Sequence, residues 1–300
     1  DNKDGITPLQ GIKALVGEKI KINHAVGCSM MSRDTTGIGE AVEATLKSDV
    51  AVIFCGSSSA SLARDYTRTN CGEGFDLSDL SLTGAQSDLI QAVYATGKPF
   101  AISWEKEHIP AIVAQWYGGE QEGYAIADVL FGKVNPSGHL TYSFPQSAGH
   151  LPVYYNHLPS DKGFYKRPGS YEQSGRDYVF SSPEPLWAFG HGLSYTTFSF
   201  DKMECDKNIY ASGDTIEVKV QVRNTGQRTG KEVVQLYVRD LVSSVVTPVK
   251  QLKAFAKPEL KPGEQKEVIL KVPVSELYLI DKEGIPFLEP GEFEIQVGNA

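Results

Sequence analysis

The carboxy-terminal part of the chain alternates apolar and polar side chains with a period of two. Over residues 216–223 every second residue is Ile or Val, and the residues between them are Glu, Lys, Gln and Arg. Related short runs follow at residues 233–238, 268–272 and 293–297, and turns that contain Gly and Pro separate them. Alternation of this kind places one face of a strand in a core and the other in water. The pattern therefore predicts an antiparallel β-sandwich over residues 197–300.

The amino-terminal part shows a different pattern, in which apolar runs alternate with amphipathic stretches. Residues 50–55 are all apolar and end at Gly56, which is typical of a strand buried on both faces of a parallel sheet. Residues 38, 42 and 46 are Ile, Val and Leu, a spacing that places them on one face of a helix. Further helices are expected from residues 8, 83 and 118, and further strands at residues 19–25 and 140–144. This order of elements predicts an open, largely parallel α/β sandwich.

A long segment between these two parts follows neither pattern. Residues 145–196 are rich in Pro, Gly and Tyr and have no sustained periodicity. Such a segment in a compact protein usually wraps a surface or lines a site. We therefore predict two domains: an α/β sandwich domain at residues 1–196, with residues 145–196 as its wrapping linker, and a β-sandwich domain at residues 197–300.

Charge and composition exclude several classes of function. The 300 residues carry a formal net charge of −8, so no basic stripe is available to neutralise the phosphates of a nucleic acid. No apolar run approaches the roughly 20 residues that a membrane helix needs, so we expect no membrane partner. The four cysteines lack the spacing of a zinc site, and no cofactor or metal is implied. Whether Cys28 and Cys71, both in predicted loops, form a disulfide is left open.

The loop that follows the apolar run at residues 50–55 carries the candidate chemistry. Loops at the carboxyl ends of parallel strands are where open α/β sheets place ligand sites. Glu73 stands between two glycines, where the backbone can take a positive φ and project one carboxylate from a tight turn. Most loop glutamates are solvated surface charges, so the spacing alone does not decide between that reading and catalysis. The serines at residues 57–59 lack the lysine of a phosphate-binding loop, which argues against a nucleotide site.

Four stretches of the chain carry a family resemblance: residues 71–76 with 80–86, residues 125–132 with 135–138, residues 186–198, and residues 230–238. Together they resemble glycoside hydrolase family 3, the β-glucosidase family, over nearly the whole chain. The resemblance implies an α/β sandwich domain followed by a fibronectin type III-like β-sandwich. It also implies that a barrel domain supplies an aspartate nucleophile, and that Glu73 is the catalytic general acid/base of a retaining enzyme.

The chemistry of retaining glycosidases agrees with this role for Glu73. Such enzymes need two carboxyl groups about 5–5.5 Å apart, of which one attacks the anomeric carbon and the other protonates the leaving oxygen. Burial beside a sugar and a second carboxylate is expected to raise the pKa of the proton donor. Arg64, Asp65 and Arg68 lie on the same loop and are candidate substrate-binding residues, with solvated surface charge as the alternative reading.

The chain departs from the family pattern in ways that bear on its function. The barrel and its Ser-Asp-aromatic nucleophile motif are missing, as are the first strand of the domain and an apolar strand between Pro99 and Phe100. A histidine, His139, also stands where the family has an arginine. We therefore expect part of a larger periplasmic or extracellular enzyme that lacks its barrel domain in cis and is inactive alone. Its small-molecule partner would be an oligosaccharide or glucoside. The alternative is a non-catalytic carbohydrate-binding or structural fragment.

Overall fold

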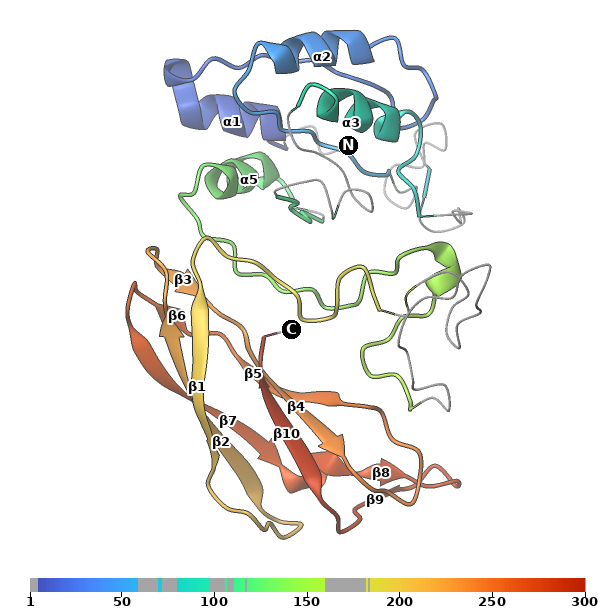
Figure 1. The fold of residues 1–300 in the computed structure, drawn as a ribbon, viewed down its shortest axis with the longest axis vertical. Coiled ribbons are helices and arrows are strands. Elements are labelled where there is room, and N and C mark those ends of the chain that lie inside the picture. Colours follow the sequence, from blue (N-terminus) through green and yellow to red (C-terminus); the bar gives the residue numbers. More distant parts are fainter. Residues whose placement is uncertain are drawn as a thin grey trace. The chain divides into compact units, whose positions relative to one another are not determined.

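The chain folds into two compact units (Figure 1). The computed structural model describes residues 5–58, 70–71, 80–97, 106, 111–116, 118–159, 182 and 184–299. Unit 1 comprises Asp1–Phe131 and Gln146–Gly149, and unit 2 comprises Gly132–Pro145 and His150–Ala300. The domain boundary expected at residue 196 marks where regular strands begin, and it stays a prediction.

Unit 1 is built around four α-helices in its described residues, and most begin close to where the sequence predicts them. They are α1 (Pro8–Val16), α2 (Ile38–Leu46), α3 (Gln86–Tyr94) and α5 (Glu122–Leu130), and the short 3₁₀ turn η1 (Gly17–Lys19) follows α1. A second 3₁₀ turn, η3 (Ala148–His150), spans the boundary between the two units. Thr7 and Gln10 start α1 with a capping box, because each side chain accepts the backbone N–H of the other.

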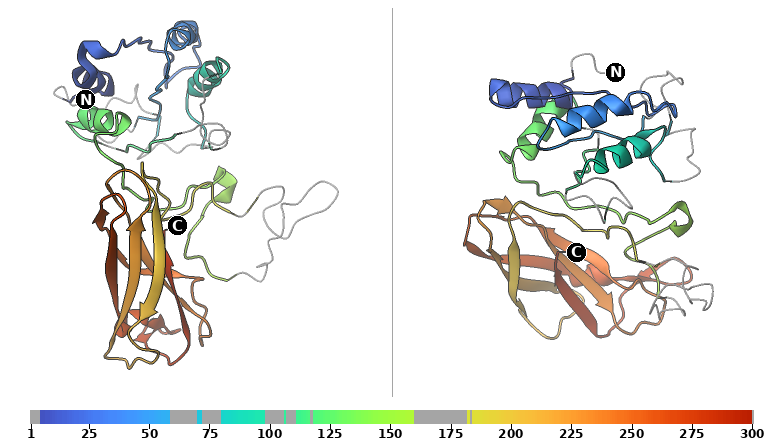
Figure 2. Two further views of the ribbon diagram at one scale, coloured as in Figure 1. Left: turned by 60° about the vertical axis from the view of Figure 1, so that its left-hand side comes forward. Right: turned by 45° about the horizontal axis from the view of Figure 1, so that its top comes forward.

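The helices of unit 1 pack in two pairs, α1 with α5 and α2 with α3 (Figure 2). Glycines bring α1 and α5 close together, because a Cβ placed on Gly11 would lie 1.9 Å from the carbonyl oxygen of Gly123. The backbone of Ile6 fixes the same contact by accepting the N–H of Gly123 at 2.9 Å and donating to Glu120 at 2.8 Å. Any side chain on Gly11 would force these helices apart.

The segments of unit 1 that were predicted as strands differ from the sequence prediction. Residues 20–28 and 50–58 contain neither helix nor strand, and none of the described residues of unit 1 belongs to a named strand. Val50, Val52 and Phe54 are 73%, 48% and 48% exposed, so the prediction of a strand buried on both faces was wrong for this segment. The physical reason is that an apolar run is buried as a strand only where neighbouring strands and helices cover it, and none of the described residues flanks this segment with a strand.

Unit 2 contains the predicted antiparallel β-sandwich. One sheet has the order β1-β2-β7 and the other the order β10-β4-β5, and two short ladders, β3–β6 and β8–β9, lie beside them (Figures 1 and 2). The long strands are β1 (Phe198–Cys205), β2 (Thr215–Asn224), β4 (Val234–Asp240), β5 (Gln251–Ala256), β7 (Gln265–Pro273) and β10 (Phe293–Gly298). The short elements are β3 (Gly230–Lys231), β6 (Glu259–Leu260), η4 (Val274–Leu277), β8 (Leu279–Ile280) and β9 (Pro286–Phe287).

The core of the sandwich comes from the alternating residues. In β2, Ile216, Val218, Val220 and Val222 are buried, and they pack with residues of the other sheet such as Leu236. Strand β4 departs from the alternation because all of Val234–Val238 are buried. One face of β4 therefore meets the core, and its other face is covered by a different part of unit 2.

That cover is a two-stranded segment, residues 139–144 beside residues 186–191, which we call the junction ribbon. Backbone hydrogen bonds join Leu140 to both His191 and Gly190, and Phe144 to both Trp187 and Leu186, at 2.7–2.8 Å. Tyr155 extends the cover, because its ring stacks on Phe189 at 4.0 Å and meets Tyr237 of β4 edge-on at 6.0 Å.

Candidate functional site

The four site residues predicted from the sequence lie outside the described residues. These are Glu73, Arg64, Asp65 and Arg68. Their roles stay predictions. The structure does describe both ends of the loop that carries Arg64, Asp65 and Arg68, at residues 58 and 70, and the chain again from residue 80. The contacts that hold these two ends therefore define the position of the loop.

The two ends of the loop are tied to each other. The N–H of Ser58 donates to the Oδ1 atom of Asn70 at 2.8 Å, and the N–H of Asn70 donates back to the carbonyl of Ser58 at 3.0 Å. The N–H of Cys71 shares the same carbonyl at 3.3 Å. This reciprocal pair fixes where the chain leaves and where it returns, three residues before Glu73.

The amide of Asn70 also ties the returning end to two other parts of unit 1. Its Nδ2 atom donates to the hydroxyl of Thr83 at 2.6 Å and to the carbonyl of Met30 at 3.1 Å. Thr83 lies just before α3, so the loop end is anchored to the start of that helix. Hydrogen bonds from one amide to three separate segments make Asn70 a rigid reference point for the residues that follow it.

Gln86, the first residue of α3, holds the other end in a related way. Its Oε1 atom accepts the N–H of Gly56 at 2.8 Å, and its Nε2 atom donates to the carbonyl of Gly56 at 2.9 Å and to that of Thr83 at 2.9 Å. Gln86 is only 5% exposed. Its side-chain amide therefore satisfies both backbone groups of Gly56, as a neighbouring strand would.

Sequence reasoning missed both amides as parts of the site. Asn70 stands in a polar loop and Gln86 in a polar helix start, where such residues are usually solvated. The available signal was the position of Gln86 at the head of a helix that follows the Glu73 loop. Cys28 and Cys71, whose pairing was left open, are both free thiols, and burial and then the nearby Asp88 raise the pKa of Cys28.

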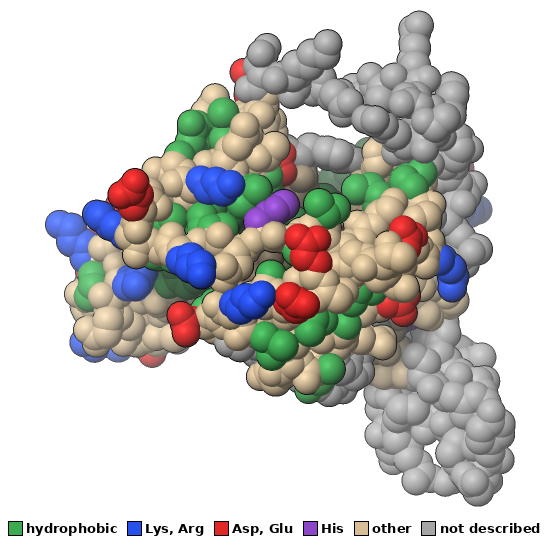
Figure 3. All heavy atoms as spheres, turned by 90° about the horizontal axis from the view of Figure 1, so that it is seen from above, with side chains coloured by type: hydrophobic (Ala, Val, Ile, Leu, Met, Phe, Trp, Pro, Cys, Tyr) green, Lys and Arg blue, Asp and Glu red, His purple; other side chains and the backbone are tan. Residues whose placement is uncertain are grey.

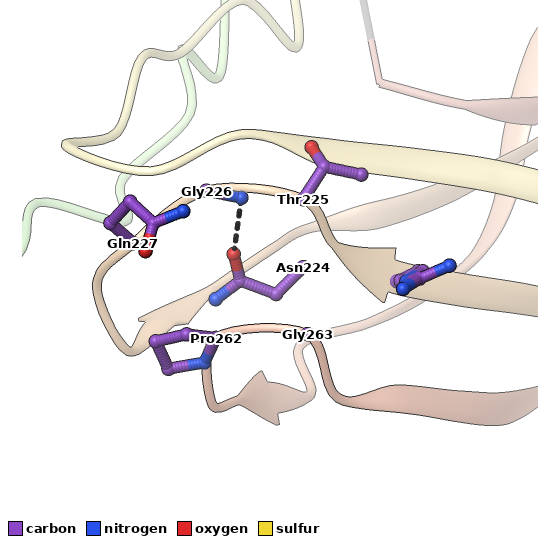
Figure 4. A pocket seen from close by; sticks show the side chains of 7 residues that line it. Asn224, Thr225, Gly226, Gln227, Pro262 and Gly263 are labelled. Carbon is purple, nitrogen blue, oxygen red and sulfur yellow. Dashed lines mark hydrogen bonds between the residues drawn. The ribbon is translucent and has the colours of Figure 1, made fainter.

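A shallow pocket of about 380 Å³ lies at one end of the sandwich in unit 2, far along the chain from this loop (Figure 4). At its centre is Asn224, which is fully buried. Its Oδ1 atom accepts from Thr196 at 2.7 Å and from Gly226 at 3.0 Å, and its Nδ2 atom donates to the carbonyls of Arg228 and Leu260. This amide joins turns of the unit. The pocket lining includes no Asp, Glu, His, Ser or Cys, so it lacks the paired carboxylates of a glycosidase site.

Neither the charges on the face drawn in Figure 3 nor the metal-ligand groups of the described residues indicate a second site. The face in Figure 3 carries Lys and Arg interspersed with Asp and Glu. Among the described residues, no group of three or more His, Cys, Asp or Glu is arranged to hold a metal ion. In the same part of the chain, no helix is long and apolar enough to cross a membrane.

Comparisons with known proteins give a consistent result. Residues 2–195 match the glycosyl hydrolase family 3 C-terminal domain, and residues 232–300 match a fibronectin type III-like domain. A β-xylosidase from Formosa agariphila is 42% identical over 98% of this chain and 39% of its own length. A periplasmic β-glucosidase from Salmonella typhimurium is 34% identical over 98% of this chain and 41% of its own length.

Solved structures extend the comparison to the fold. A β-glucosidase from Listeria innocua superposes with a TM-score of 0.84 at 30% identity, and the match covers 100% of this chain and 41% of that one. The same enzyme has been solved with glucose and, as a mutant, with laminaribiose. These matches confirm the predicted fold class, an α/β domain followed by a fibronectin type III-like sandwich. The chain spans about two fifths of the length of these relatives.

Proposed function

This chain belongs to glycosyl hydrolase family 3, and on that premise we propose that it supplies the general acid/base, Glu73, of a retaining β-glucosidase-type enzyme. The observation that carries the proposal is the frame around the loop. Asn70 and Gln86 hold the chain at residues 56, 58 and 70 with side-chain amides, so the Gly-Glu-Gly motif starts from an anchored position. Fixed placement of a proton donor is what general acid catalysis requires.

The reaction needs a second carboxylate in addition to Glu73. We propose that an aspartate of a barrel domain, joined in cis, attacks the anomeric carbon while Glu73 gives its proton to the glycosidic oxygen of the leaving group. In the second step Glu73 takes a proton from water, and the water oxygen displaces the aspartate from the sugar. The chain alone, without that nucleophile, is expected to be inactive.

The proposed substrate is a β-linked terminal sugar, with glucose as the preferred unit. The support comes from the Salmonella and Listeria relatives, which are β-glucosidases, and from the complexes of the Listeria enzyme with glucose and laminaribiose. The Formosa relative is a β-xylosidase, so xylosides are the competing substrate class. Arg64, Asp65 and Arg68 are proposed to contact sugar hydroxyls. A location in the periplasm or outside the cell is proposed from the periplasmic relative.

The dependence of the rate on the leaving group tests this function. In a protein that joins this chain to its proposed barrel domain, Glu73→Ala should lower kcat by about 10²- to 10⁴-fold for aryl β-glucosides with poor leaving groups. The loss should be much smaller for activated leaving groups, because they depart without a proton.

The exposed Glu18 provides a matched control, since Glu18→Ala removes a carboxylate from the surface of unit 1. It should leave the rate unchanged for every substrate. An equal loss for good and poor leaving groups in Glu73→Ala would assign Glu73 a structural role. Parallel assays with aryl β-xylosides decide between the two sugar classes.

A further inference from the structure

The junction ribbon is fastened to the sandwich by a buried polar network, separate from the glycosidase chemistry proposed above. The Nδ1 atom of His139 lies 2.6 Å from the carbonyl oxygen of Gly190, and the Nε2 atom of Gln235 donates to the same oxygen at 3.2 Å. The hydroxyl of Tyr237 donates to the Oε1 atom of Gln235 at 2.5 Å. Burial raises the pKa of Tyr237 to about 12, so this hydroxyl keeps its proton.

A carboxylate faces the other side of the His139 ring. The Nε2 atom of His139 lies 3.7 Å from the Oε1 atom of Glu232, and the two side chains are only 10% and 5% exposed. Asn299, which follows β10, donates to the same Oε1 atom at 3.3 Å. In the described part of the chain, His139 from the ribbon is the titratable group facing Glu232, whereas the adjacent Lys231 pairs with Glu259.

The positions of these atoms limit where protons can sit. A carbonyl oxygen only accepts, so the Nδ1 atom of His139 carries a hydrogen that it donates to Gly190. The Nε2 atom then either carries a second hydrogen, which makes the ring positive, or turns a lone pair toward Glu232. A neutral ring beside an ionised Glu232 would leave a buried carboxylate facing a lone pair, which is the costly arrangement.

We propose that the His139–Glu232 pair is a proton-dependent fastening that holds the junction ribbon on β4. With one proton shared between the two side chains, the pair is satisfied as an ion pair or as a neutral acid beside a neutral ring. When that proton leaves, the fastening weakens and the ribbon loosens from the sandwich before the sandwich itself unfolds.

The direction in which the pKa of Glu232 is shifted agrees with this proposal. Burial raises the pKa of Glu232 above its ordinary value of 4.5, and His139 and the hydrogen bond from Asn299 offset only part of this rise. An acid with a raised pKa in the folded state stabilises the fold fully below its unfolded pKa, and this stabilisation is lost as the pH rises through the folded pKa. The ribbon should therefore be held most firmly in mildly acidic solution.

Denaturant unfolding at several pH values tests the proposal. Between pH 4.5 and 9, the folding equilibrium constant should fall further in the wild type than in Glu232→Gln. A pKa of Glu232 that is one pH unit higher in the folded state than in the unfolded state corresponds to an extra fall of about tenfold. His139→Arg, which supplies a charge that does not titrate, should flatten the dependence as well. The control Glu259→Gln removes an exposed, ion-paired carboxylate and should keep the wild-type dependence. The same pH dependence in Glu232→Gln as in the wild type would overturn the proposal.

Hydrogen exchange on the wild type tests the same point if a variant fails to fold. After correction for the intrinsic rate, the amides of Leu140 and Gly190 in the ribbon should lose protection as the pH rises, and the buried amides of β2 should not. Parallel changes in the ribbon and in β2 would contradict a local, proton-dependent fastening.

Discussion

Strand β2 and residues 50–58 both carry several Val and Ile side chains, yet only β2 belongs to a sheet. The strand pairs with β1 on one side and with β7 on the other, and Val218 and Val222 are fully buried between the sheets. Residues 50–58 have no strand partner among the described residues, and Val50 is 73% exposed. The comparison shows that an apolar run becomes a buried strand only when neighbours supply backbone partners and cover its faces.

The comparison also explains the role of the side-chain amides of Gln86 and Asn70 in unit 1. In β2 the backbone groups are satisfied by adjacent strands. In residues 50–58, side chains take over part of this role, because Gln86 pairs with Gly56 and Asn70 pairs with Ser58. Two side-chain amides thus hold residues 56 and 58, just before the proposed catalytic loop begins.

The largest difference in stability is expected between truncations of an apolar side chain in the sandwich and in residues 50–58. Leu236 of β4 is fully buried, so Leu236→Ala should lower the free energy of unfolding of the sandwich by about 2–5 kcal/mol. Val52 is 48% exposed, and Val52→Ala should change stability by no more than about 0.5 kcal/mol. Urea unfolding followed by circular dichroism measures both. Equal losses would mean that residues 50–58 are covered as well as the sandwich core.

A smaller effect is expected from Gln86→Ala. It leaves the N–H and carbonyl of Gly56 without their side-chain partner, and because Gly56 is only half-buried the cost should be about 1 kcal/mol, the low end for an unsatisfied polar group. Gln91 lies on an exposed position of the same helix, and Gln91→Ala provides the matched control. Hydrogen exchange at Gly56 should rise in the first variant alone. Unchanged hydrogen exchange at Gly56 in Gln86→Ala would refute the idea that the Gln86 amide takes the place of a neighbouring strand.

Asn70→Ala should affect catalysis more than stability. In a protein that contains the proposed barrel, loss of the bonds to Thr83 and Met30 should lower kcat about tenfold with little change in KM, or about 1.4 kcal/mol in the barrier. The loss should be greatest for poor leaving groups, because the displaced group is the proton donor. Asn23→Ala removes an amide that bonds to Lys47 and Ser48 instead, and should keep the wild-type kcat.

Features set by local pattern could be predicted from the sequence, and features set by distant partners could not. The alternation at residues 216–223 predicted β2 and its buried face, and the spacing of Ile38, Val42 and Leu46 predicted α2. Burial of residues 50–55 was predicted wrongly because it depends on neighbours that the run itself does not specify.

The partners of buried polar residues could not be predicted from the sequence either. Gln86 and Glu232 are polar residues in polar contexts, and their partners lie far away along the chain, so periodicity assigned no contact to them. The Gly-Glu-Gly motif pointed to Glu73 and the family resemblance gave it a role, but the amides that hold its loop became visible only in the structure.

The pH dependence of kcat/KM tests the central claim most directly. A general acid must be protonated to act, so the rate of the enzyme that joins this chain to its barrel should fall as the pH rises through the pKa of its proton donor. In Glu73→Ala this basic limb should disappear, while the acidic limb set by the nucleophile remains. A basic limb that persists unchanged in Glu73→Ala would show that another group donates the proton and would contradict the account.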